Sequence, residues 1–286
     1  MKSTARQIIT FLVLVFVFSS IPYVLMIHTG HIRAGDGMAV RLIMWCPALA
    51  ALATCALFRI DLATLGWKWR PARYEGLAYI LPWIYALPVY VACWIAVKGS
   101  FGFGAYERHI STSYGLTHWP RLAALGLGIP LTASLGMTGS LSTALGEEIG
   151  WRGFLLPRLT HQFGFTVGCL FSGLVWALWH YPALLWADYN SGTDKRYALT
   201  CFTLMVTANA FLMGWLRLKS GSLWPCAILH ASHNLIIQSI LDQLTTQSGV
   251  ALYVTTEFGA GLVLTTGAVA FSFWRRRGEF QKLSGG

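Results

Sequence analysis

The most regular feature of this sequence is a series of long apolar stretches separated by short polar connectors. A helix that crosses a lipid bilayer needs about 20 mainly apolar residues. By that criterion the pattern predicts an all-α fold, a polytopic integral membrane protein with about eight transmembrane helices. The predicted spans are residues 8–27, 40–58, 77–97, 121–158, 165–186, 199–218, 223–241 and 251–274.

Three parts of this pattern are less regular. We expect residues 98–120, which contain four glycines, to form a loop. Residues 121–158 are either one long bent span or a span followed by a re-entrant piece. The first apolar run is long enough to cross the membrane and shows no convincing cleavage site. We therefore interpret it as a retained helix and not as a secretory signal peptide.

Composition supports the membrane assignment and narrows the function. Hydrophobic residues make up 55% of the 286 residues and charged residues 11%, whereas soluble domains average about 25% charged residues. The net charge of +10 comes from basic residues that lie mainly between the apolar stretches. There they set the topology and meet anionic lipid. The lipid bilayer is therefore an expected partner, and nucleic acid is not.

The distribution of basic residues also predicts the orientation. With eight spans, both ends of the chain lie on one side of the membrane. That side carries thirteen of the 21 basic residues, the other side carries seven, and Arg152 lies within the membrane. Because cytoplasmic loops are enriched in Lys and Arg, we expect both termini in the cytoplasm, with the bacterial inner (plasma) membrane as the location.

Two adjacent carboxylates and an arginine stand inside the apolar run at residues 140–158. On an α-helix, Glu148 and Arg152 lie four residues apart on one face, in the better orientation for an ion pair. Glu147 points about 100° away from that face, and Trp151 lies one turn beyond it. Charged groups are costly in a bilayer and Glu148 already has a partner, so Glu147 is the strongest functional candidate.

Two later predicted spans also carry polar or aromatic residues four positions apart. Trp176 and His180 share one helical face, and His230 and Asn234 share another. Taken singly, such residues are more often interhelical hydrogen-bonding groups. Taken together with the glutamates they predict a site, because polar groups at this depth should face the interior and contact one another. His233 adds a titratable group whose role the sequence leaves open.

The chemistry that this set supports best is hydrolysis in a polar intramembrane cavity. A carboxylate with a neighbouring histidine can take the proton of a bound water. His230 and Asn234, as donors on one helical face, could stabilise an oxyanion. A serine or cysteine nucleophile with a fitting base is missing, and so is a second lone acidic residue at depth, because the aspartates all fall in predicted loops.

A catalytic metal is the chemical alternative. Glu147, His180 and His230 could bind zinc and leave an open position for water, as His₂Glu zinc sites do. The HExxH pattern of many zinc proteases is absent from the sequence. We therefore expect no cofactor and keep zinc as the alternative.

The ordered set Glu-Glu-x-x-x-Arg, Trp-x-x-x-His and His-x-x-x-Asn, on successive predicted spans, resembles the CPBP family of intramembrane proteases. That family includes the type II CAAX prenyl endopeptidases and the bacteriocin-processing and bacteriocin-immunity (Abi) proteins. The resemblance covers roughly residues 140–241. The chain accordingly divides into residues 1–120 without a motif, catalytic helices at 121–245, and a last span with a basic tail at 246–286.

The resemblance implies a role for each motif residue. Glu147 and His180 would activate the attacking water, and His230 with Asn234 would form the oxyanion site. Glu148 and Arg152 would form a structural ion pair that orients the site. Residues expected beside these are Trp151, Trp176 and His233.

The resemblance also bears on the class of enzyme. The family was long described as metalloproteases, and its better understood members resemble metal-independent glutamate proteases. Trp176 stands where the family often has phenylalanine, and we expect this change to be conservative.

The expected function is therefore an intramembrane endopeptidase that cleaves a peptide or protein substrate, with lipidated substrates among the candidates. A non-enzymatic bacteriocin-immunity or scaffold protein with a relict site is the main alternative. A proton-coupled transporter, in which buried Glu and His form a relay, is a weaker one. Transporters usually show interrupted helices in corresponding positions of two halves, whereas all the polar groups here follow residue 139.

Overall fold

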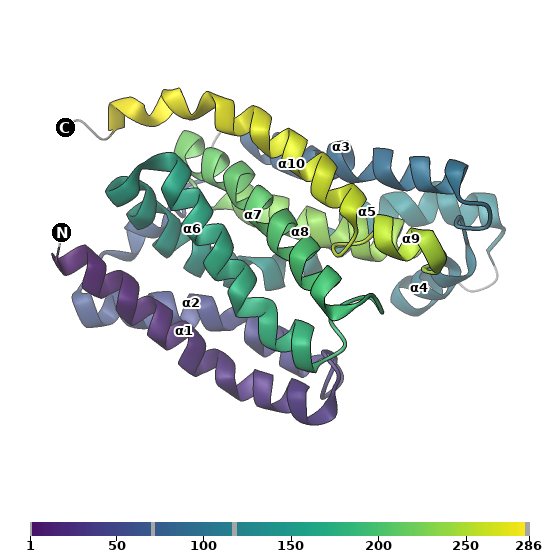
Figure 1. Cartoon of the computed structure of the whole chain (residues 1–286), viewed down its shortest axis with the longest axis horizontal. Helices are drawn as coiled ribbons and strands as arrows, with labels where there is room; N and C mark the ends of the chain where they lie inside the picture. Colours follow the sequence, from purple (N-terminus) through teal and green to yellow (C-terminus); the bar gives the residue numbers. More distant parts are fainter. Residues whose placement is uncertain (1, 70–71, 116–118, 284–286) are drawn as a thin grey trace.

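The computed structural model describes residues 2–69, 72–115 and 119–283, and their regular structure is helical apart from one isolated β-bridge (Figure 1). The α-helices are α1 (Lys2–Thr29), α2 (Met38–Phe58), α3 (Ala72–Ala96), α4 (Gly104–Tyr114), α5 (Arg121–Glu148), α6 (Leu156–Trp186), α7 (Lys195–Ser220), α8 (Trp224–Asn234), α9 (Gly249–Val254) and α10 (Ala260–Arg275). Two π-helical segments, η2 (Ile149–Leu155) and η3 (Leu235–Leu241), follow α5 and α8, and two 3₁₀ segments are η1 (Leu62–Leu65) and η4 (Arg276–Leu283).

Long apolar helices make this an integral membrane protein, and the predicted all-α polytopic fold class is confirmed. Five helical runs in the described part of the chain are long and apolar enough to cross a bilayer. These runs are Thr4–Thr29, Met38–Phe58, Ala72–Ala96, Arg121–Trp186 and Lys195–Ser220. Their outer faces carry exposed large apolar side chains, such as Ile21 and Ile95, as expected of surfaces that meet lipid.

Two predicted elements differ from the structure. The predicted loop at residues 98–120 contains the helix α4, and residues 116–118 of that loop lie outside the described part. The predicted last span, 251–274, is not one helix. It is α9 and α10, joined by a non-helical bend that includes Thr256, whose φ of 65° lies in the left-handed region. A β-branched residue avoids that region, so the surrounding structure must impose the bend.

The question left open for residues 121–158 is settled in favour of one long piece. Helix α5 continues without a break through η2 into α6. The helical conformation is interrupted only further on, at Gly164, whose φ of 76° and ψ of 171° suit a residue without a side chain. Within this run, residues 149–155 adopt the wider π form where an α-helix was predicted. π-Helical turns are frequent at functional sites.

The π-helical segment is held tightly against α2. A Cβ added to Gly150 would lie 2.5 Å from Cβ of Pro47 and 2.6 Å from its carbonyl oxygen. Only glycine permits so close an approach between the two backbones. The contact fixes the end of α5, and with it the two glutamates, relative to α2.

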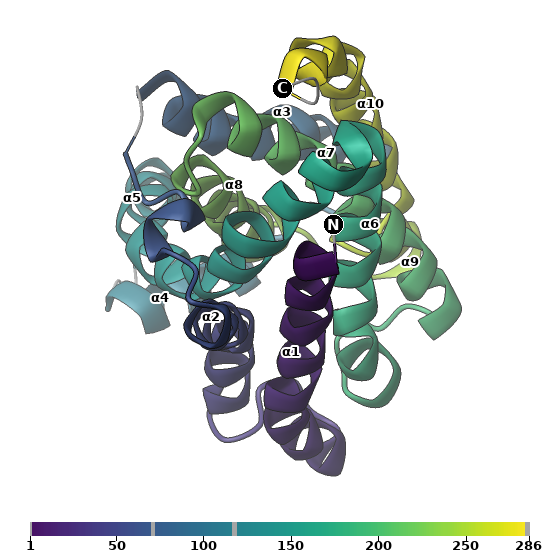
Figure 2. The same ribbon diagram turned by 90° about the vertical axis from the view of Figure 1, so that its left-hand side faces the viewer.

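Helix α8 is the central helix of the bundle. It lies between α3, α5 and α7, and residues Pro225 to His233 are all buried (Figure 2). A helix that is buried on all sides can present polar groups only to other helices. His230 and His233 therefore face protein and not lipid.

Both ends of the chain lie at the same end of the bundle (Figure 1). The α1–α2, α6–α7 and α9–α10 connections lie at the opposite end, as the alternating direction of the helices requires.

Candidate active site

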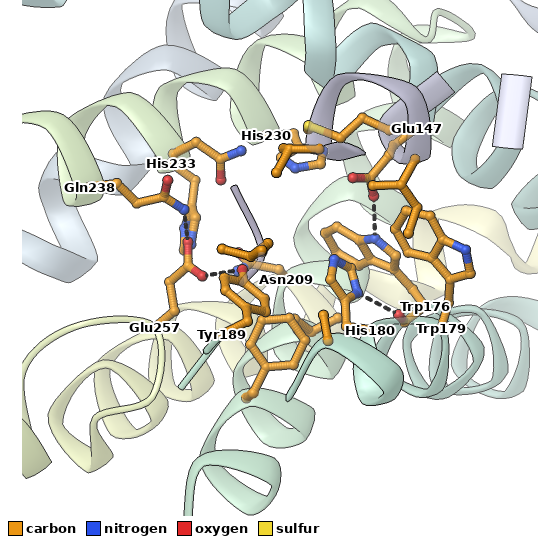
Figure 3. Close-up of a pocket in the computed structure, with 18 of the residues that line it drawn as sticks. Glu147, Trp176, Trp179, His180, Tyr189, Asn209, His230, His233, Gln238 and Glu257 are labelled. Carbon is orange, nitrogen blue, oxygen red and sulfur yellow. Dashed lines mark hydrogen bonds and ion pairs between the residues drawn. The ribbon is translucent and has the colours of Figure 1, made fainter. Parts of the chain in front are cut away.

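A cavity of about 250 Å³ lies inside the bundle, and all three sequence motifs contribute to its wall (Figure 3). One water needs roughly 10–15 Å³ of such space, so the cavity can hold several waters or part of a peptide. Predicted site residues that line it are Glu147, Trp176, His180, His230, His233 and Asn234. Residues from α5, α6 and α8, far apart in sequence, thus meet in one place.

Among the residues that the structure describes, one hydrogen bond holds the Glu147 carboxylate in the cavity wall. It lies in the last turn of α5 and is 2% exposed. Its Oε2 accepts a hydrogen bond of 2.7 Å from Nε1 of Trp176. A carboxylate has about four acceptor positions. Capacity therefore remains for a water or a substrate group.

Trp176 is the residue that joins the three motifs. Its indole N–H donates to Glu147, and its carbonyl oxygen lies 2.8 Å from Nδ1 of His180. Its ring meets the ring of His230 edge-on at 5.3 Å, and the guanidinium of Arg152 lies 3.9 Å from its centre. Phenylalanine has no N–H to donate to the carboxylate, so Trp176 makes a contact that the expectation of a conservative change did not include.

The hydrogen bond of His180 fixes which ring nitrogen faces the cavity. A carbonyl oxygen can only accept, so Nδ1 carries the proton and donates to Trp176. In the neutral ring, Nε2 is then the acceptor. The ring is packed edge-on against Trp179 and Phe202 at 4.8 and 4.9 Å, which restricts its orientation.

Glu148 and Arg152 form the predicted ion pair, although the helix between them is π and not α. Nη1 of Arg152 lies 2.8 Å from Oε1 of Glu148, and both side chains are fully buried. The same oxygen lies 2.8 Å from Nδ1 of His230, a contact that the sequence did not predict. Glu148 therefore orients His230 and directs its Nε2 away from the carboxylate.

Two other predicted neighbours lie apart from Glu147. Trp151 does not line the cavity but is buried against Phe11 and Trp179, each at 5.7 Å between ring centres. His233 lines the opposite part of the cavity, where Nδ1 lies 2.7 Å from the hydroxyl of Tyr85.

Glu257 is a cavity residue that the sequence analysis missed. It lies in the bend between α9 and α10, is 4% exposed, and lies across the cavity from Glu147 (Figure 3). The sequence analysis expected no second lone acidic residue besides Glu147, and Glu257 is a buried one in the same cavity wall, carried by a connection at the end of the bundle. The available signal was that Glu257 is the sole charged residue in the apolar stretch 251–274. The cost of an isolated charge in such a stretch should have marked it.

The zinc alternative can be compared with this geometry. In the described part of the chain, no three His, Cys, Asp or Glu side chains are grouped closely enough to hold a metal ion. Nδ1 of His180 and Nδ1 of His230 each contact an oxygen of another residue, an arrangement that also occurs in metal-binding histidines and leaves Nε2 of each ring available. As they lie, Glu147, His180 and His230 do not form a ligand set of the kind that zinc requires.

All three motifs lie in a part of the chain that is similar to known proteins. Residues 129–236 match the family model described as type II CAAX prenyl endopeptidase Rce1-like. Over 83 residues the chain is 25% identical to the CAAX prenyl protease 2 of Methanococcus maripaludis. The aligned segment covers 28% of this chain and 31% of the relative, so the chain matches less than a third of that protein's length. The resemblance predicted from the motifs is thus confirmed, and Glu257 lies outside the matched residues.

Proposed function

Because residues 129–236 match the type II CAAX prenyl endopeptidases, we propose that this protein is an intramembrane endopeptidase. In this proposal a water bound between Glu147 and His180 attacks the peptide bond. The observation that carries it is the connection through Trp176, which binds Glu147 by its indole N–H and His180 by its carbonyl. Both groups therefore face one cavity in fixed orientations.

The proposed mechanism uses the acceptor groups that the structure leaves facing the cavity. Glu147 takes a proton from the water, and Nε2 of His180 accepts the second hydrogen bond and orients the water for attack on the carbonyl carbon. The C–N bond then breaks, and the proton passes from Glu147 to the leaving amine. Together these steps add one water across one peptide bond.

The negative charge that develops on the substrate oxygen needs donors. Asn234 can supply its side-chain N–H. Nε2 of His230 can donate only when the ring is doubly protonated, because Nδ1–H already faces Glu148. We propose that the Glu148 carboxylate balances this charge, and that Arg152 in turn keeps Glu148 ionised and in place.

The experiment that tests the function is cleavage by the purified protein in lipid nanodiscs. Prenylated and unprenylated peptide libraries are incubated with it, and new termini are identified by mass spectrometry. We expect discrete cleavage products, and activity that persists in a strong chelator because the residues are not arranged as a metal site. Activity that is lost in chelator and restored by zinc would contradict the metal-free mechanism. An absence of any product would contradict the enzyme.

The position of the cavity leads to a proposal on topology. The cavity is lined by Arg33, Tyr189 and Glu257, which belong to the connections at the end of the bundle remote from both chain termini. If the termini are cytoplasmic, as the basic residues predict, the cavity opens toward the opposite face.

Labelling with a membrane-impermeant maleimide tests this topology. All six native cysteines are buried, so the background should be low. In intact cells we expect Ser191→Cys, in the α6–α7 connection that carries the cavity residue Tyr189, to react. We expect Gly278→Cys, in the tail, to react only after permeabilisation. Both positions are exposed. The reverse pattern would place the cavity opening in the cytoplasm.

A further inference from the structure

The cavity contains a second carboxylate that the proposed mechanism does not use. Glu257 is 4% exposed and lines the same cavity as Glu147, from the opposite side (Figure 3). A buried carboxylate is costly unless it is paired with a positive charge or well hydrogen-bonded. Its partners therefore indicate what it is for.

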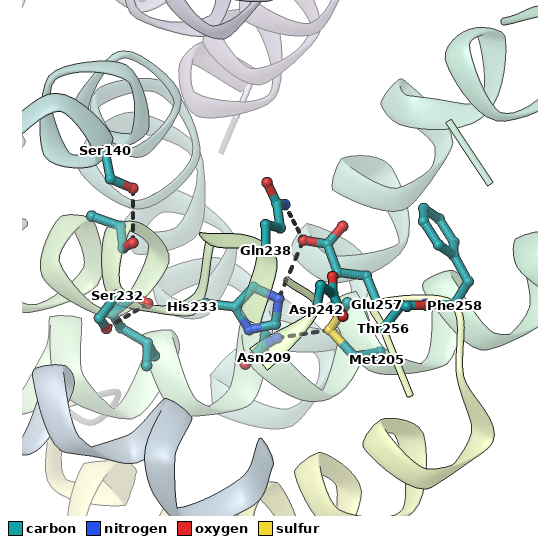
Figure 4. A network of polar contacts seen from close by, with 12 residues as sticks. Ser140, Met205, Asn209, Ser232, His233, Gln238, Asp242, Thr256, Glu257 and Phe258 are labelled. Carbon is teal, nitrogen blue, oxygen red and sulfur yellow. Dashed lines mark hydrogen bonds and ion pairs between the residues drawn. The ribbon is translucent and has the colours of Figure 1, made fainter. Parts of the chain in front are cut away.

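The partners of Glu257 are mainly neutral donors. Its Oε2 accepts a hydrogen bond of 2.6 Å from the hydroxyl of Tyr189, and Oε1 accepts one from Nε2 of Gln238 (Figure 4). The nearest ionisable base is His233, whose Nε2 lies 3.7 Å from Oε1. Among the described residues, no Lys or Arg forms an ion pair with it. The carboxylate is held in place without a permanent cation.

A second polar group in the cavity, the side-chain amide of Asn209, has an oxygen without a hydrogen-bond donor among the described residues. Asn209, on α7, is 3% exposed and lines the cavity, and its Oδ1 has no hydrogen-bond partner among the described residues. Its Nδ2 lies 3.0 Å from Sδ of Met205. A buried acceptor without a partner is unfavourable, which indicates that a ligand supplies the missing N–H.

We propose that Glu257 and Asn209 form a subsite for a positively charged, N–H-rich group of the substrate, the side chain of a lysine or arginine. This rests on the proposed peptidase function. An ammonium or guanidinium carries several N–H donors, which suit a carboxylate and an amide oxygen in one cavity, and it would supply the cationic partner that Glu257 lacks.

The geometry sets where this group lies and which substrates it excludes. Glu257 lies across the cavity from Glu147. The basic side chain that it binds therefore belongs to a substrate residue near the scissile bond, and lies away from the peptide group that Glu147 faces. The same carboxylate repels an anionic group at that place, including a free C-terminal carboxylate. The cation Arg33 also lines the cavity, but it is exposed, so solvent and salt screen its charge.

The test compares matched peptides in which one residue near the cleaved bond is lysine or norleucine, placed in turn on each side. Norleucine keeps the aliphatic chain and removes the charge. We expect kcat/KM for the best lysine peptide to exceed that of its norleucine partner about 10- to 100-fold, mainly through KM. In Glu257→Gln that ratio should fall to about one, and in Asn209→Ala it should fall by a smaller factor. Peptides with a free and an acetylated N-terminus separate a side-chain cation from a terminal amine.

Glu75→Gln is the matched control, because Glu75 is another buried glutamate and does not line the cavity. It should leave the lysine preference intact. Equal cleavage of lysine and norleucine peptides by the wild-type protein would overturn the subsite but leave the peptidase standing.

A binding measurement keeps the proposal testable without catalysis. Calorimetric titration of lysine and norleucine peptides into Glu147→Gln protein should show the same preference. If this protein binds both peptides equally, the subsite is refuted even if no cleavage is ever detected. If Glu257→Gln fails to fold, the lysine preference of Asn209→Ala and the calorimetric titration still test the subsite.

Discussion

Glu147→Gln is expected to abolish peptide cleavage, with kcat lowered by about 10²- to 10⁴-fold. The amide keeps the size of the side chain and can still accept the hydrogen bond from Trp176, but it cannot take a proton from water. The protein should therefore insert and fold normally. Rates are measured in nanodiscs on the best wild-type substrate, and folding by the melting temperature of the same preparation.

Trp176→Phe should lower the cleavage rate less than Glu147→Gln does. The ring remains while the hydrogen bond to Glu147 is lost, so we expect a partial loss of about 10-fold, which is the value of one oriented hydrogen bond. Glu147→Gln with near wild-type activity would remove Glu147 from the mechanism.

Two other results would favour the alternative functions. A cellular phenotype that survives Glu147→Gln would favour an immunity or scaffold protein, and proton flux in liposomes would favour a transporter.

Glu148→Gln is expected to destabilise the fold by about 3–5 kcal/mol, because it leaves Arg152 as an uncompensated charge in a fully buried position. It also removes the charged acceptor that orients His230, so activity should fall as well. Reversible unfolding in mixed micelles measures the first effect, and cleavage at low temperature measures the second.

The double variant Glu148→Leu with Arg152→Met separates stability from orientation. Replacing a buried ion pair by apolar groups of similar size is often neutral, so most of the stability should return. Activity should not return, because His230 still lacks its partner. A loss of less than about 1 kcal/mol in the single variant would show that the pair is not needed for stability.

Much of the fold could be read from the order of apolar and polar residues. Spans such as 40–58 and 199–218 correspond closely to α2 and α7, because a bilayer demands helices of a fixed minimum length. The three motifs could be located because isolated polar groups are costly in an apolar segment. The ion pair between Glu148 and Arg152 followed from local spacing alone.

The tertiary structure decided the rest, since it depends on contacts between distant parts of the chain. Whether Trp176 donates to Glu147 depends on how α6 lies against α5, and not on helical periodicity. Glu257 reaches the cavity because the last predicted span bends between α9 and α10, where packing overrides the apolar pattern. Sequence periodicity thus determined which helices form and which polar groups must be sheltered. Only the packing of those helices determined which groups meet and on which side the cavity opens.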